Sequence, residues 1–125
     1  MNLTTTPEMI VPDQSEINFL ENQVNLKLQV LFADSLRLNV KKHFNVYLEY
    51  SGHVNGIRLS YWLKDDLDHV RTILGPLYIK PFSSNTDHAK KYKEILQRID
   101  TASTHLHQAH AEFMKDFLNT GEEDE

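Results

Sequence analysis

Apolar residues fall on alternate positions through a long central stretch of this sequence, between Val24 and Leu63. Up to Tyr50 the even-numbered positions carry most of the apolar side chains, and the odd-numbered positions between them carry mainly amides and cations. A period of two is typical of β-strands with one buried face. The pattern therefore predicts an antiparallel meander of three to four strands over residues 24–63.

A helical interpretation competes with the strand interpretation over the first part of this stretch. Six apolar residues there have helical spacing: Ile17, Leu20, Val24, Leu28, Leu31 and Leu38. A helix would leave four others on its opposite side: Leu26, Val30, Leu36 and Val40. Because alternation accounts for more of the apolar residues, strands are the expected structure. Ser15 is a helix-capping residue type and predicts the start of a helix. This helix is expected to be short because strands are predicted from Val24 onward.

The turn signals after Tyr50 support a hairpin. Ser51 to Gly56 contains two glycines and Asn55, which are residue types that adopt positive φ at little cost. Alternation resumes from Ile57 to Leu63. These features predict that two of the strands pair across this turn.

Helices are expected after the meander. Acidic residues at 65 and 66 suit a helix N-terminus, and Gly75 with Pro76 ends a helix, which predicts a short helix over about 65–74. An extended segment follows at Leu77 to Phe82, where Pro81 restricts it to an edge. The apolar residues from Tyr92 to Phe117 recur with helical spacing and predict a long helix over about 87–118. The predicted fold class is α+β.

The length of 125 residues suits one domain. We expect a flexible N-terminal arm at 1–14, a single α+β domain at 15–119 and a disordered acidic tail at 120–125. The chain has no cysteine, which excludes disulfides, thiolate metal ligands and a cysteine nucleophile. The sequence shows neither a basic and apolar leader nor a run of eighteen apolar residues, so a cytoplasmic protein without membrane contact is expected.

The long C-terminal helix is the first candidate for an interaction surface. A helix of about thirty residues extends ~45 Å, which exceeds the width of a small sheet, so part of its apolar stripe is expected to pack against a second copy or another protein. His110 lies within that stripe, where a histidine is typical of a core or an interface; the sharper alternative is a contact that loosens when His110 is charged. The candidate contact residues are Ile99, Leu106, His110, Phe113 and Phe117.

The polar face of the expected sheet is the second candidate surface. The net charge is −5, yet six basic and only two acidic residues lie between Val24 and Lys64. Cations that track phosphates and rings that stack on bases would together suit single-stranded nucleic acid, with the acidic tail controlling access. No sequence signature of a known RNA-binding fold accompanies them. The residues are Lys27, Arg37, Lys41, His43, Tyr47, Arg58, Trp62 and Lys64.

Metal and catalytic chemistry have weaker support. On a helix, His105 and His107 point away from each other, and His107 with His110 supplies two of the ligands that a zinc site needs. The sequence has no nucleophile elbow, glycine-rich phosphate loop or zinc-protease motif. We therefore expect no cofactor, no metal and no enzymatic activity. The function predicted first is a protein-interaction module: an adaptor, chaperone or inhibitor of a larger machine, with nucleic-acid-handling machines among the candidates.

Overall fold

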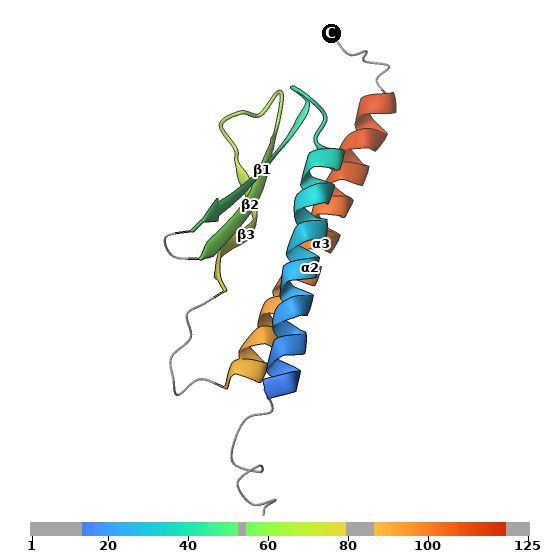
Figure 1. Cartoon of the computed structure of the whole chain (residues 1–125). Coiled ribbons are helices and arrows are strands. Elements are labelled where there is room, and N and C mark those ends of the chain that lie inside the picture. The colour runs from blue at the N-terminus through green and yellow to red at the C-terminus, as the bar shows by residue number, and fades with distance from the viewer. Residues whose placement is uncertain (1–13, 53–54, 80–86, 120–125) are drawn as a thin grey trace, which may run out of the picture.

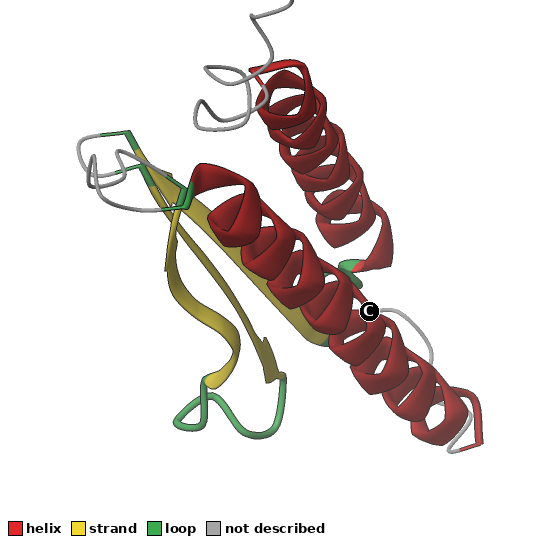
Figure 2. Cartoon of the chain, turned by 90° about the horizontal axis from the view of Figure 1, so that it is seen from below, coloured by secondary structure: helices red, strands yellow, loops and turns green. Residues whose placement is uncertain are grey.

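The computed structural model describes residues 14–52, 55–79 and 87–119. Two long helices lie side by side, and a three-stranded antiparallel sheet packs on one side of the pair (Figures 1 and 2). The order is α2 (Gln14–Leu38), β1 (Phe44–Ser51), β2 (Gly56–Leu63), β3 (Arg71–Tyr78) and α3 (His88–Asn119). The α+β class is confirmed, as is the long C-terminal helix. Residues 1–13 of the predicted arm and the predicted tail at 120–125 lie outside the described residues.

Helix α2 replaces the first of the expected strands, so the prediction of strands from residue 24 to about 40 is wrong. The buried residues of α2 have helical spacing: Ile17, Leu20, Val24, Leu31, Ser35 and Leu38. The stretch contains neither glycine nor proline to interrupt a helix. The alternation arose because apolar residues also occupy the exposed side of the helix, including Leu26 and Val30. Two apolar faces on one helix produced a period close to two.

The hairpin of β1 and β2 lies where the sequence predicted it. Its register pairs Phe44 with Leu63 and Ser51 with Gly56, which places the even positions of β1 on one face of the sheet. Asn55 in the turn has a φ of 52°, as expected for its residue type. The inner face carries Phe44 and Leu59, which are both fully buried.

Strand β3 occupies much of the segment that was expected to be a helix, so the prediction of a helix over 65–74 is wrong. Asp66 instead organises the β2–β3 connection: its carboxylate lies 2.7 Å from Nδ1 of His69 and accepts a bond of 2.9 Å from Arg71. The hydrogen bond from His69 is the main cause that lowers the pKa of Asp66 below its usual value. Gly75 and Pro76 sit at irregularities in the β2–β3 register, which an edge strand tolerates. The predicted extended segment at 77–82 is described only as far as Ile79.

The two helices run in the same direction, as their colours in Figure 1 show. Ion pairs join them in matching order: Glu16 with Lys93 at 3.3 Å and, further along, Lys27 with Asp100 at 2.7 Å. These pairs are partly exposed and are worth at most about 1 kcal/mol each. The core between the helices and the sheet therefore supplies most of the stability; its fully buried residues include Val24, Leu31, Phe44, Leu59, Ile99 and Leu106.

Candidate functional site

The apolar stripe of α3, predicted to contact a partner, faces the chain's own core along most of its length. Ile99 is 1% exposed and Leu106 is fully buried. Helix α2 and the sheet cover this part of α3, so a second chain cannot reach these two side chains in this arrangement. The predicted apolar stripe of α3 is confirmed. It is covered by α2, a segment for which the sequence pattern predicts strands.

The last turns of α3 hold the other three predicted contact residues in an aromatic cluster. The ring of His110 meets Phe44 edge to face with centroids 5.4 Å apart, and Phe113 lies 5.3 Å from the same Phe44. Phe117 stacks on Phe113 at 5.2 Å and contacts His43 at 5.0 Å. All three α3 residues are half-buried. Burial is the main cause that lowers the pKa of His110, and the electrostatic effects of Arg37 and of His107 add to it.

The predicted basic and aromatic surface is divided by the fold. Tyr47, Arg58 and Trp62 do share the outer face of the sheet, because the register sets Tyr47 beside Ser60, between the other two. Glu49 pairs directly with Arg58 and offsets its charge. The placement of Lys27 and Arg37 on this face is wrong, since both lie on α2. Lys41 lies in the turn before β1, His43 is buried, and Lys64 follows the end of β2.

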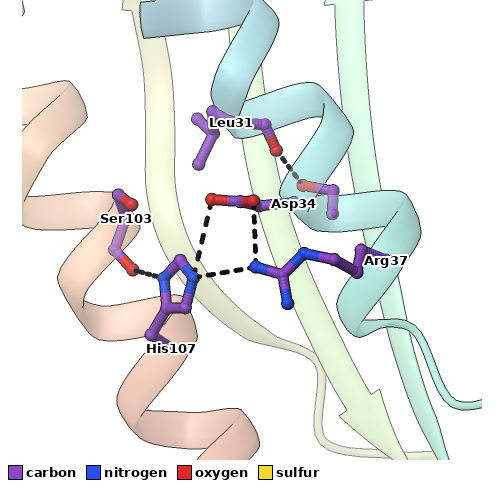
Figure 3. A network of polar contacts seen from close by, with 6 residues as sticks. Leu31, Asp34, Arg37, Ser103 and His107 are labelled. Atoms are coloured by element: carbon purple, nitrogen blue, oxygen red, sulfur yellow. Dashed lines mark hydrogen bonds and ion pairs between the residues drawn. The ribbon is translucent and has the colours of Figure 1, made fainter.

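A polar network ties the C-terminal part of α2 to α3 (Figure 3). Arg37 donates to Asp34 at 3.1 Å, and Nε2 of His107 lies 3.5 Å from the other Asp34 oxygen. His107 donates from Nδ1 to the carbonyl oxygen of Ser103 at 2.8 Å, and its Nε2 lies 3.4 Å from the guanidinium of Arg37. The network orients the two helices by charge and hydrogen bonding.

The exposed side of α2 is unusual for a surface helix. From Asn18 to Leu36 every exposed residue of this helix is uncharged. Five are large apolar side chains that are 53–68% exposed: Phe19, Leu26, Val30, Phe32 and Leu36. Helix α3, in contrast, exposes acids and bases along its length. An exposed helix side that carries large apolar residues and no charge is typical of an interaction site.

A groove of about 460 Å³ opens between one side of this helix and the inner face of the sheet. Its helical wall has the spacing of one helix face, and its floor and second wall come from the sheet and the hairpin turn. The groove is lined by Asn25, Leu28, Gln29, Phe32, Leu48, Tyr50, Asn55, Ile57 and Ile79. Most of these side chains are apolar, and the three amides supply donors and acceptors for a bound segment.

Strand β1 borders this groove and is an edge strand of the sheet. The amide of Phe44 points away from β2 and donates to Val40, and the amide of Val46 donates to Oδ1 of Asn39 at 2.8 Å. By the alternation of a strand, the amides of Leu48 and Tyr50 point the same way. Neither amide has a hydrogen-bond partner within residues 14–52, 55–79 and 87–119. The open part of the edge thus lies where the strand lines the groove.

Sequence reasoning found neither this groove nor the exposed apolar side of α2, although a signal for the exposed side was present. The residues that a helical interpretation left over, Leu26, Val30 and Leu36, are all exposed on α2. The groove itself depends on how far α2 diverges from β1, which no local pattern encodes.

Residues 14–52, 55–79 and 87–119 contain no group of three or more potential metal ligands. None of the described helices is long and apolar enough to cross a membrane. Comparisons with protein-family models, with curated proteins and with solved structures found no match.

Proposed function

We propose that this chain is a non-enzymatic protein-interaction module, of the adaptor, chaperone or inhibitor kind, that binds an extended apolar segment of another protein in the groove between α2 and β1. The observation that carries the proposal is the position of the groove directly beside the open part of the β1 edge.

The mode of binding follows from strand geometry. A segment that pairs with an edge strand gains main-chain hydrogen bonds, and its alternate side chains enter the neighbouring pocket. Here the amides of Leu48 and Tyr50 would supply the main-chain donors. The side chains of Leu28, Phe32 and Ile57 would receive the apolar groups of the segment. The preferred segment is therefore one with apolar residues at every second position.

Selection from a phage-displayed library of random linear peptides tests this proposal. We expect the full chain to enrich peptides with alternating apolar residues, because only every second side chain of a strand faces the groove. The affinity of the chain for a labelled synthetic copy of an enriched peptide is then measured by fluorescence polarisation. Failure to enrich such peptides would refute the proposal.

Two variants and a control locate the binding. Phe32→Asp puts a charge on the groove wall, and Leu48→Pro removes an edge donor that β2 does not use. Each variant is expected to lower the affinity for the peptide at least about tenfold, or ~1.4 kcal/mol of binding free energy. Leu118→Asp changes a side chain that is 67% exposed on α3 and should bind like the wild type. Equal affinity of Phe32→Asp and the wild type would place the peptide elsewhere.

A second candidate function is single-stranded nucleic-acid binding by the outer sheet face. It is favoured by the shared face of Tyr47, Arg58 and Trp62, and it is weakened by the loss of Lys27 and Arg37 from that face. Polarisation of a labelled single-stranded oligonucleotide at low salt tests it. Binding that falls with salt and with Arg58→Ala would support this function, and absence of binding at low salt would exclude it.

A further inference from the structure

We infer that a second copy of this chain packs against α2, with the two α2 helices antiparallel. The contact would use the outer stripe, defined here as Phe19, Leu26, Val30 and Ala33. All four residues are exposed. The outer stripe lies on a different side of α2 from the groove residues Leu28 and Phe32, so this inference does not depend on the proposed peptide binding.

The spacing of the outer stripe is that of a helix–helix seam. Its members follow one another by seven, four and three residues, which is the alternation of positions in a heptad. Helix α2 has 25 residues and so presents a seam of up to ~37 Å. A stripe of this period packs lengthwise on another helix at a shallow crossing angle.

The absence of charge on this side of α2 favours a second copy as the occupant. A two-fold contact brings a surface patch against itself, so a patch with a net charge repels its copy and an uncharged patch does not. Residues 14–52, 55–79 and 87–119 together carry equal numbers of basic and acidic side chains, so the net charge of −5 comes from residues outside these ranges and sets no repulsion between two copies of the described fold. The exposed residues of α2 from Asn18 to Leu36 carry no charge. Their side-chain amides both donate and accept hydrogen bonds, so they can pair with the same amides of the copy.

The residues around the outer stripe select the antiparallel orientation. Glu16 precedes the stripe and Arg37 follows it. An antiparallel pair sets the acid of each copy beside the base of the other, whereas a parallel pair sets like charges together. The same orientation places the large Phe19 opposite the small Ala33 and brings Leu26 near the two-fold axis. Opposed helix dipoles add to this preference.

Sedimentation velocity of the full chain over a range of concentrations tests the dimer. We expect the wild type to shift from monomer to dimer as its concentration rises. Val30→Asp should weaken dimerisation at least tenfold, because it buries a charge in the seam with no opposite charge facing it. Leu118→Asp is the control and should associate like the wild type. A wild type that stays monomeric at all concentrations, or a dimer that Val30→Asp leaves intact, would overturn the inference.

Cysteine cross-linking tests the orientation cleanly because the chain has no cysteine of its own. Leu26→Cys is expected to form a disulfide with itself. Phe19→Cys should not, since antiparallel helices about Leu26 separate the two copies of residue 19 by ~21 Å. A mixture of Phe19→Cys and Ala33→Cys should cross-link. Efficient self-linking of Phe19→Cys would show that the helices run parallel and would contradict the orientation.

Discussion

His110 shows how a titratable ring is accommodated beside an apolar cluster. Its edge-to-face contact with Phe44 gives the neutral ring a well-packed position. Burial and, secondarily, Arg37 and His107 lower its pKa below the ordinary value of a histidine. The folded chain thus favours the uncharged form of this side chain.

This lowered pKa predicts the direction of a pH effect on stability. In the unfolded chain His110 binds its proton with a pKa of about 6.5, and in the folded chain it does so only at lower pH. Between these two values the unfolded state holds more protons, so the free energy of unfolding rises with pH. The stabilisation is complete above about pH 6.5 and is lost as the pH falls through the lower pKa of the folded state.

Urea unfolding at a series of pH values, followed by circular dichroism, measures this effect. His110→Leu removes the titrating group and should flatten the dependence of the unfolding free energy on pH between about 5 and 7. His105→Leu alters an exposed histidine on the same helix and should keep the wild-type slope. A wild-type slope in His110→Leu would mean that another group is responsible.

At the scale of elements, α2 is where sequence and structure differ most. A helix that buries one apolar face and exposes another has no single hydrophobic direction, so its periodicity resembled that of a strand. Helix α3 shows the opposite case. Its apolar residues lie on one face and its charges on the other, and its predicted span agrees closely with the observed one.

A proline substitution tests the helical structure of α2. Asn22 is exposed on α2. Asn22→Pro removes a hydrogen bond within the helix and is expected to cost about 3 kcal/mol of unfolding free energy. Asn22→Ala should change the stability by less than about 1 kcal/mol in the favourable direction, because alanine has the higher helix propensity. Equal stability of the two variants in chemical denaturation would contradict a helix at this position.

The second misread element, β3, has a different cause. Acidic residues followed by Gly75 and Pro76 are typical of a helix with a defined start and end. In the structure Asp66 instead binds His69 and Arg71 within a turn, and the register irregularities accommodate glycine and proline. Tertiary pairing with β2 decided the outcome, and that pairing cannot be deduced from the local sequence.

At the scale of the whole molecule, the sequence predicted some of the apolar faces. It predicted only partly which elements cover these faces. The α+β class, the hairpin and the long helix followed from periodicity and turn residues. The burial of Ile99 and Leu106 depends on α2, so their accessibility does not follow from a pattern that predicts strands in place of α2. The candidate binding surfaces moved from α3 to α2 for the same reason.

The parallel course of the two helices has a consequence during protein synthesis. Glu16 and its contact Lys93 are far apart in sequence, so α2 leaves the ribosome well before its covering helix exists. Translation adds about 5–20 residues per second, so synthesis of the rest of the domain takes roughly 4–15 s. During that interval both apolar sides of the nascent α2 segment are exposed to solvent. Chaperones or neighbouring nascent chains can then bind sides that the finished fold covers in part.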